Sequence, residues 1–203
     1  MKSVGIVNYQ INNLSSIYYS IKNLKNNPIF VSEYIETKFD ILIIPGTGSF
    51  AEGMKYLLEK KLDKLIYNHI SRGGIIIAIC LGFQMLFQKS YEFGKTNGLG
   101  VLEGDIVPFG EKYDKPNIGW LKVTSRNNNK SLQNLSNNID GRYFYHVHSY
   151  YLENDFNDFT LTYSFNKNLK FTSSIYYKNI YGFQFHPEKS GNNGNEILSK
   201  IIK

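Results

Sequence analysis

The fold is decided by residues 75–82, which read IIIAICLG. Four isoleucines and one alanine form an apolar run without polar alternation, and a helical pattern continues from it as far as Phe87. A continuous apolar run that ends in a turn is typical of a strand buried on both faces, as in a parallel sheet. The sequence therefore predicts a buried strand over residues 75–79 that turns directly into a helix.

Strand, turn and helix occur in the same order twice more, nearer the N-terminus. Residues 3–8 and 41–44 are short apolar runs, and apolar residues at helical spacing follow over 14–24 and 50–72. Asn13 is placed to cap the first of these helices. Buried strands that alternate with helices indicate a parallel α/β sheet.

The second half of the chain is richer in Tyr, Phe, Thr and Val, in short runs between turns of Asn, Asp and Gly. Residues 143–151 and 161–165 are two such runs, and we expect antiparallel strands that pack onto the same sheet. A last strand is predicted over 181–185 and a closing helix over 194–203. The expected fold is α/β, a central mixed and mostly parallel sheet flanked by helices, with additional antiparallel strands in the second half.

We expect residues 1–203 to form a single domain. The hydrophobic content of 42% is enough for a core, and the Asn-rich tract over 126–138 is better read as a surface loop than as a linker. The N-terminus lacks the apolar stretch of a secretory signal, and no apolar run approaches the roughly 20 residues that cross a bilayer. A cytoplasmic location without membrane attachment is therefore expected.

The composition restricts both the partners and the redox chemistry. The net charge is +6 and the sequence pI is about 9.1, yet there are only three arginines, and the lysines are scattered among asparagines. This argues against nucleic-acid binding; a solvated surface, an acidic partner or a phosphorylated ligand would explain the charge. The single cysteine, Cys80, excludes an internal disulfide, so it is either a small buried apolar residue or a thiol kept for chemistry.

Cys80 occupies the turn between the predicted strand and helix. Ala78 and Gly82 lie two residues before and after it, which is the pattern of a nucleophile elbow with cysteine in place of serine. Such a turn strains its central residue and exposes the side chain, and a helix N-terminus favours a thiolate. These features point to a reactive cysteine. A core cysteine at the end of an ordinary strand remains the alternative.

His186 offers a general base for that thiolate, and Glu188 offers a carboxylate that orients the base. Pro187 restricts the backbone between the two. His186 lies at the carboxyl end of a predicted strand, the edge of an α/β sheet where ligands collect, so it can approach Cys80 despite their separation in sequence. The alternative is an ordinary surface loop.

Acyl transfer also requires N–H donors for the developing oxyanion. The backbone N–H of Leu81 can supply one donor. The segment Gly46-Thr47-Gly48, after the run at 41–44, can supply another because glycine lets the backbone approach or reorient. Taken alone, this segment is only a turn.

Together, these features resemble the class I glutamine amidotransferases, whose triad is a cysteine in an elbow and a histidine separated by one proline from a glutamate. Closer still, the chain resembles the glutaminase subunits of imidazole glycerol phosphate synthase, nearly end to end. The resemblance implies a flavodoxin-like sheet and no metal or organic cofactor. It rests on six segments: PGTGSFAEGM (45–54), ICLGFQMLF (79–87), GLGVLEGDIV (98–107), PNIGW (116–120), HSYY (148–151) and GFQFHPEKSG (182–191).

The resemblance also assigns roles to matching residues. It makes Cys80 the nucleophile that forms a glutamyl thioester, His186 its acid and base, and Glu188 the orienting carboxylate. The other matches would hold the substrate glutamine: Gln84, Glu92 beside its α-ammonium group, and the backbone of Ser149 and Tyr150 at its α-carboxylate.

A partner is implied as well. A cyclase subunit, a (β/α)8 barrel through which ammonia travels, would form a heterodimer with this chain and face Trp120, Tyr145 and Lys189. Seen in isolation, Trp120 and Tyr145 would be core residues and Gln84 a solvated helix residue.

The chain departs from the family pattern in three places. The segment NYQINN over residues 8–13 replaces Asp-Tyr-Gly-x-Gly-Asn and loses both glycines, Ala78 replaces the usual glycine of the elbow, and Leu121 stands where asparagine is common. These changes spare the triad but touch the side that would face the partner. His146 and His148 alternate with aromatic residues, so we expect one to point inward and the other outward, and assign neither a catalytic role.

The leading hypothesis is a glutaminase that supplies ammonia for imidazole glycerol phosphate synthesis in histidine biosynthesis. The departures keep open a second client, a cyclase-like protein that aminates a sugar for surface polysaccharides. A third hypothesis, a catalytically silent binding subunit, is opposed by the complete triad. Because isolated subunits of this family are poorly active, we expect an oxyanion donor within Gly46–Gly48 to be misaligned until the partner engages.

Overall fold

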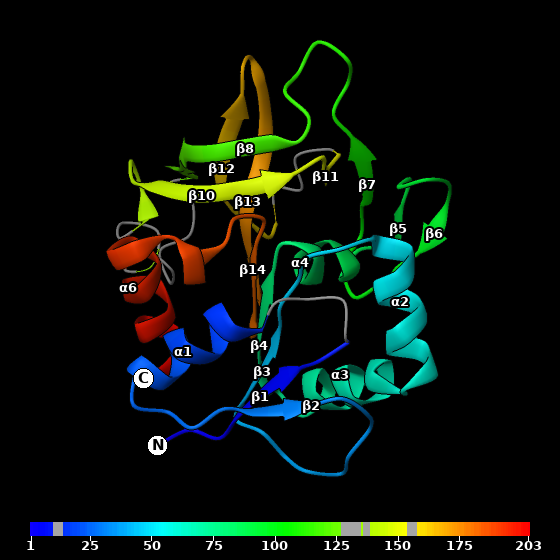
Figure 1. Cartoon of the computed structure of the whole chain (residues 1–203), viewed down its shortest axis with the longest axis vertical. Coiled ribbons are helices and arrows are strands. Elements are labelled where there is room, and N and C mark those ends of the chain that lie inside the picture. Colours follow the sequence, from blue (N-terminus) through cyan, green and yellow to red (C-terminus); the bar gives the residue numbers. More distant parts are fainter. Residues whose placement is uncertain (10–13, 127–134, 136–138, 154–157) are drawn as a thin grey trace.

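The computed structural model describes residues 1–9, 14–126, 135, 139–153 and 158–203, and an eight-stranded sheet forms its centre (Figure 1). The first five strands in spatial order are parallel neighbours, and the last three are added in antiparallel fashion. In that order the strands are β2 (Ile29–Val31), β1 (Val4–Val7), β3 (Ile41–Ile44), β4 (Ile75–Ile79), β14 (Ile180–Phe183), β13 (Leu169–Tyr177), β12 (Thr160–Asn166) and β9 (Thr124–Ser125).

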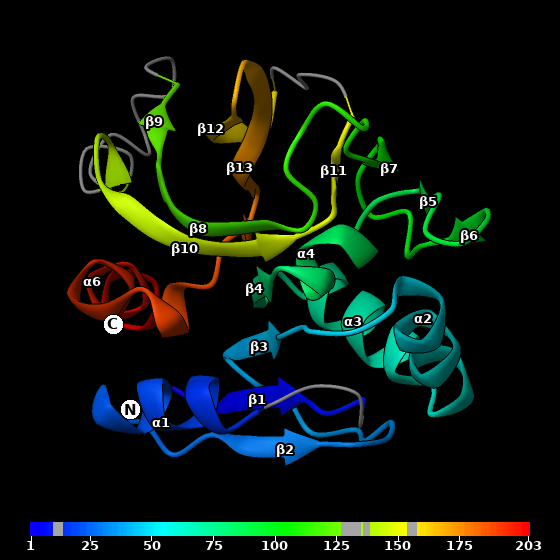
Figure 2. The same ribbon diagram turned by 45° about the horizontal axis from the view of Figure 1, so that its top comes forward.

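Helices cover both faces of the parallel part of the sheet (Figures 1 and 2). One face carries α1 (Ser15–Asn23) and α6 (Gly191–Ile202), and the other carries α2 (Phe50–Glu59), α3 (Leu62–Ser71) and the short α4 (Leu81–Met85). Strand β3 is apolar throughout because both of its faces are covered by helices. Ile41 and Ile43 pack on the side of α1 and α6, while Leu42 and Ile44 pack on the side of α2 and α3. Every residue of β3 is buried.

The predicted strands at 41–44 and 75–79 are present with the expected ends, and the strand predicted at 3–8 is one residue shorter at each end. The helical segment at 50–72 is two helices, because Lys61 adopts a left-handed conformation with φ 56° between them. Asn13 and most of the tract over 126–138 lie outside the described residues. None of the helices that the structure describes is long and apolar enough to cross a membrane.

The second half corrects one expectation. Strands β12 and β13 do extend the central sheet, but the run at 143–151 leaves it and is divided at Ser149. Its first part, β10 (Tyr143–His148), pairs only with β8 (Asn117–Lys122). Its second part, β11 (Tyr150–Leu152), joins a four-stranded sheet with β7 (Asp105–Pro108), β5 (Lys89–Ser90) and β6 (Thr96–Asn97).

In Figure 1 the β8–β10 pair runs across the molecule above the carboxyl ends of the parallel strands and in front of β12 and β13. This placement explains why β10 cannot continue the central sheet: it runs across the other strands rather than beside them. It also brings the end of β10 to the turn that follows β4, which is the position of Cys80.

Candidate active site

Cys80 lies in a strained turn between β4 and α4. Its backbone has φ 50° and ψ −106°, a conformation that costs about 1–3 kcal/mol in a residue with a side chain. The Cys80 N–H donates to the Phe183 carbonyl at 2.7 Å, and its own carbonyl accepts from the Gln84 N–H at 3.0 Å. A Cβ on Gly82 would lie 2.0 Å from the Ile44 carbonyl oxygen, so only glycine fits there. The predicted elbow is therefore present, but its cysteine is not exposed as expected, because Cys80 is 6% exposed and lines a cavity.

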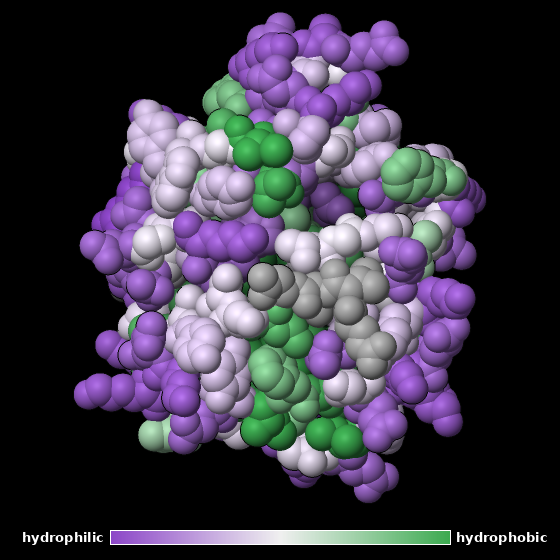
Figure 3. All heavy atoms as spheres, in the orientation of Figure 1, coloured by the Kyte–Doolittle hydropathy of each residue, from purple (hydrophilic) through white to green (hydrophobic). Residues whose placement is uncertain are grey.

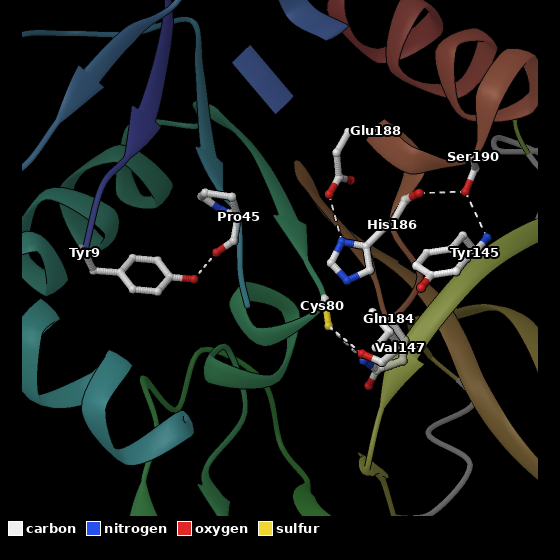
Figure 4. A network of polar contacts seen from close by, with 9 residues as sticks. All are labelled: Tyr9, Pro45, Cys80, Tyr145, Val147, Gln184, His186, Glu188 and Ser190. Carbon is white, nitrogen blue, oxygen red and sulfur yellow. Dashed lines mark hydrogen bonds and ion pairs between the residues drawn. The ribbon is translucent and has the colours of Figure 1, made fainter. Parts of the chain in front are cut away.

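His186 follows the neighbouring strand. Strands β4 and β14 are parallel with Ile79 opposite Phe183, so the residues after each strand emerge at the same edge of the sheet. His186 Nδ1 lies 2.8 Å from Glu188 Oε1, and the two side chains are only 1% and 8% exposed. Figure 4 shows the imidazole between the Glu188 carboxylate and the Cys80 sulfur. Glu188 itself lies in a short 3-10 helix, η2 (Pro187–Lys189).

The charge state of His186 is set by opposing effects. Burial lowers the pKa of His186, but the charge of Cys80, together with the hydrogen bond and charge of the Glu188 carboxylate, outweighs burial and raises the pKa to about 10. Within the described residues, His186 Nε2 is buried and has no hydrogen-bond partner. The Cys80 thiol instead donates to the Val147 carbonyl at 3.7 Å. Figure 4 places the Cys80 sulfur beside the His186 ring, and among the described residues no hydrogen bond joins the two.

A cavity of about 250 Å³ opens beside Cys80. Its volume is at the small end for a ligand pocket. Most of the residues that sequence analysis assigned to the oxyanion or the substrate line it: Thr47, Gly48, Leu81, Gln84, Glu92, Ser149 and Tyr150. Gly46 is not part of the lining and packs beneath it, where an added Cβ would come within 2.5 Å of the Leu81 Cβ.

Two of the lining side chains are held in place by the fold. Glu92 Oε2 accepts the Phe50 N–H at 2.5 Å, at the start of α2, and burial raises the pKa of Glu92 although this hydrogen bond opposes it. Gln84 is 7% exposed and is therefore not the solvated helix residue of the alternative reading. Its Nε2 donates to the Tyr150 carbonyl at 3.1 Å and to Gln184 Oε1 at 3.0 Å.

The expectation for His146 and His148 is wrong. Both are buried, and His146 Nδ1 lies 3.2 Å from His148 Nε2. Residues two apart in a strand share a face, so the alternation that puts one inward puts the other inward too. Sequence reasoning also missed Gln184 and Val147, which contact the Cys80 sulfur through a side-chain amide and a backbone carbonyl. Knowledge of the register between β4 and β14 would have placed Gln184 next to Cys80.

The residues expected to face a partner lie beside the site. Trp120 and Tyr145 are directly opposite across β8 and β10, with ring centroids 6.1 Å apart. Trp120 is 53% exposed, so it does not fill the core, and Lys189 is exposed in η2. The His186 N–H donates to the Tyr145 carbonyl at 2.9 Å, which links this surface to the triad histidine. Among the residues that the structure describes, no cluster of His, Cys, Asp or Glu could hold a metal ion.

Comparison with known proteins gives one consistent result. The family model for the CobB/CobQ-like glutamine amidotransferase domain matches residues 6–193. The imidazole glycerol phosphate synthase subunit HisH of Wolinella succinogenes is 37% identical, over 98% of this chain and 98% of its own length. The subunit HisH of Bacillus subtilis is 35% identical, over 98% and 95%.

Solved structures share the fold at lower identity. A chain of PurLQS from Thermotoga maritima superposes with a TM-score of 0.75 at 18% identity, over 100% of this chain and 98% of that one. A crystal structure of a glutamine amidotransferase gives a TM-score of 0.72 at 15% identity, over 98% and 97%. The family model and the curated relatives both span nearly the whole sequence. The chain therefore belongs to the class I glutamine amidotransferase family and is HisH-like.

Proposed function

We propose that Cys80, His186 and Glu188 form the triad with which this glutamine amidotransferase subunit hydrolyses glutamine to glutamate and ammonia. The observation that carries the proposal is the buried imidazole of His186, which is bonded to Glu188 on one side and faces Cys80 with an unpartnered Nε2 on the other. Nucleophile, base and orienting acid in this order are the requirements of covalent acyl transfer.

The first half-reaction starts from a Cys80 thiolate beside the His186 imidazolium, the charge state that the raised pKa of His186 favours; it forms when the thiol leaves the Val147 carbonyl and gives its proton to His186 Nε2. The thiolate attacks the side-chain amide carbon of glutamine, so that a C–S bond forms and the carbonyl oxygen becomes an oxyanion. The C–N bond then breaks, and the imidazolium returns a proton to the leaving nitrogen, which departs as ammonia. The raised pKa of His186 supports this step because it keeps the imidazolium available at neutral pH.

In the second half-reaction His186 takes a proton from water, and the hydroxide attacks the thioester carbon. The C–S bond breaks, glutamate leaves and the thiolate–imidazolium pair is restored. The oxyanion of both steps would be bound by the Leu81 N–H and by a donor within Gly46–Gly48. Substrate glutamine would occupy the cavity, with its α-ammonium group at Glu92.

The ammonia is delivered, in this proposal, to a cyclase subunit that makes imidazole glycerol phosphate in histidine biosynthesis. Support comes from the curated relatives, which are subunits of that synthase. The partner would be a (β/α)8 barrel that docks on Trp120, Tyr145 and Lys189 in a cytoplasmic heterodimer. Contact at Tyr145 would reach the triad, because the Tyr145 carbonyl holds the backbone of His186.

The test is glutamate release by the complex of this chain with its cyclase subunit and nucleotide substrate. Cys80→Ala should reduce glutamine-dependent turnover by at least about 10³-fold, while turnover supplied with ammonium salts persists and shows that the cyclase subunit is active. Co-elution of the two subunits in size-exclusion chromatography shows that the complex still assembles. Normal stimulated hydrolysis by Cys80→Ala would remove the thioester mechanism.

Two further measurements separate the alternatives. Complementation of a histidine auxotroph, with the matching cyclase supplied, distinguishes the histidine pathway from a sugar-aminating client. An electrophilic glutamine analogue should label Cys80 in the complex, and a labelled residue excludes a silent binding subunit.

A further inference from the structure

Gln184 is a fully buried polar side chain at the end of β14, and the triad chemistry leaves it without a role. It does not line the substrate cavity, but it contacts Gln84 and Cys80, which both do. Its Oε1 is 3.0 Å from Gln84 Nε2, and its Nε2 is 3.8 Å from Cys80 Sγ (Figure 4). Burial of an amide is costly unless its groups are paired, so these contacts hold Gln184 in one orientation.

The direction of the hydrogen bonds follows from the Tyr150 carbonyl, which can only accept. Gln84 must therefore present Nε2 to Tyr150, and the same nitrogen reaches Gln184. Gln184 must accept this hydrogen bond with its carbonyl oxygen, since a flipped amide would place its NH₂ group next to the NH₂ group of Gln84. Its own NH₂ group is consequently the part that faces the Cys80 sulfur.

We propose that Gln184 is a hydrogen-bond donor to the nucleophile, held in place by Gln84 and the Tyr150 carbonyl. This inference rests on the proposed function of Cys80. A donor to sulfur favours the thiolate before attack and again when the thioester breaks, because both states carry negative charge on Sγ. Gln84 lines the substrate cavity, so the chain of amides also connects the bound glutamine to the sulfur.

Two variants of Gln184 remove the donor in different ways. Gln184→Met keeps the length of the side chain without its polar groups, and Gln184→Glu keeps the acceptor for Gln84 but places a carboxylate beside the sulfur. Gln88→Met is the matched control, because Gln88 is an exposed glutamine just beyond α4. All three are measured in the complex with the cyclase subunit.

The decisive readout is the pH dependence of Cys80 alkylation by iodoacetamide, which follows the thiolate fraction. Gln184→Met should move the midpoint of this profile up by about one to two pH units, and Gln184→Glu by at least as much. The kcat for glutamine should fall about 10- to 100-fold, with KM changed less than about threefold. Gln88→Met should keep the wild-type profile and kinetics.

A purely structural role for Gln184 predicts a different pattern. Both variants would then melt at a lower temperature while the alkylation profile of their folded fraction stays at the wild-type midpoint, and that outcome overturns the inference. If the wild-type complex neither hydrolyses glutamine nor reacts at Cys80, the proposed function itself fails. An active wild type with unshifted Gln184 variants rejects only the role of Gln184.

Discussion

In the proposed triad, Glu188 would act on Cys80 only through His186. Its Oε1 accepts from His186 Nδ1 at 2.8 Å, and this bond leaves Nε2 as the nitrogen that faces Cys80. The carboxylate also belongs to the charges that raise the pKa of His186 against the effect of burial. A neutral amide in its place would keep the ring orientation but lose the charge.

Glu188→Gln should therefore lower kcat for glutamine hydrolysis in the complex by about 10²- to 10⁴-fold, the range of general acid–base contributions. KM should change less than about threefold, because Glu188 is not part of the cavity lining. Steady-state glutamate release measures both parameters. Glu196→Gln is the control, since Glu196 pairs with Arg142 at an exposed position. A variant that retains wild-type kcat would show that the charge of Glu188 is dispensable.

His146 is a second residue whose behaviour follows from its hydrogen bonds. His148 Nδ1–H donates to the Tyr150 carbonyl, so His148 Nε2 accepts from Asn117 Nδ2 and from His146 Nδ1–H. His146 Nε2 is then a buried acceptor with no donor among the described residues. Burial, and after it the neighbouring His148 and His186, hold the pKa of His146 well below its usual value.

A histidine with a lowered pKa destabilises the fold in acid. As the pH falls below about 6.5, His146 is protonated in the unfolded chain but stays neutral in the folded one. The free energy of unfolding therefore decreases. His146→Phe, which suits a site between Phe171 and Phe185, should raise the unfolding free energy by about 1 kcal/mol near pH 7.5. Near pH 5 the gain should be about 2 kcal/mol larger.

Urea unfolding at the two pH values measures this difference. Tyr19→Phe is the control because Tyr19 is 60% exposed, and it should stay within about 0.5 kcal/mol of wild type at both. An equal gain for His146→Phe at both pH values would mean that His146 takes up its proton normally in the folded state.

At the scale of elements, contacts with neighbouring strands hold the turn between β4 and α4 in a conformation that its residues would not favour on their own. Cys80 has a backbone conformation that residues with a side chain rarely adopt, and Gly82 allows α4 to pass the end of β3. The strain is sustained because the Cys80 N–H is bonded to Phe183 and its carbonyl to the Gln84 N–H.

This strain can be measured with two substitutions at the same position. Glycine adopts positive φ without cost, so Cys80→Gly should be more stable than Cys80→Ala by about 1 kcal/mol. Ala78→Gly is the matched control two residues earlier: it lies within β4, where glycine should cost about 1 kcal/mol. Thermal unfolding compares all three. A Cys80→Gly variant less stable than Cys80→Ala would show that the elbow carries no strain.

The spacing of apolar residues along the chain predicted the strands of the parallel part of the sheet. Strands β1, β3 and β4 were predicted clearly because helices bury both of their faces, which makes these strands apolar throughout. Strand β2 escaped prediction because it is a three-residue edge strand with two exposed positions. The crossing of β10 over the sheet depends on its pairing with β8, which local pattern does not contain.

The candidate site divides in the same way. The elbow and the His186–Glu188 pair follow from short motifs, because each is formed by residues close in sequence. Gln184 depends on the register between two strands about a hundred residues apart, so its approach to Cys80 appears only in the assembled sheet. Contacts of this kind are invisible to periodicity and turn chemistry.

On the scale of the whole molecule, the β8–β10 pair separates the interior from one exposed apolar face. Its inner side carries Phe144, His146 and His148, all buried. The opposite side places Trp120 against Tyr145 in the ladder, and β8 also exposes Ile118. Apolar residues gather over β8 in Figure 3. A face of exposed large apolar side chains on a two-stranded ribbon beside the triad is typical of a protein interface.

Trp120 is expected to be an energetic centre of that interface, since buried tryptophans dominate protein–protein affinity. Trp120→Ala should weaken binding to the cyclase subunit by about 2 kcal/mol, or about 30-fold in Kd, measured by titration calorimetry. The isolated chain should stay folded and lose only about 1–2 kcal/mol of stability, because about half of Trp120 is already packed, partly against Tyr145. Tyr19→Ala, which removes a 60% exposed aromatic side chain on α1, is the control and should leave Kd unchanged. If Trp120→Ala instead unfolds the chain and leaves the affinity of its folded fraction intact, the exposed face of β8 supports the fold and the partner docks elsewhere.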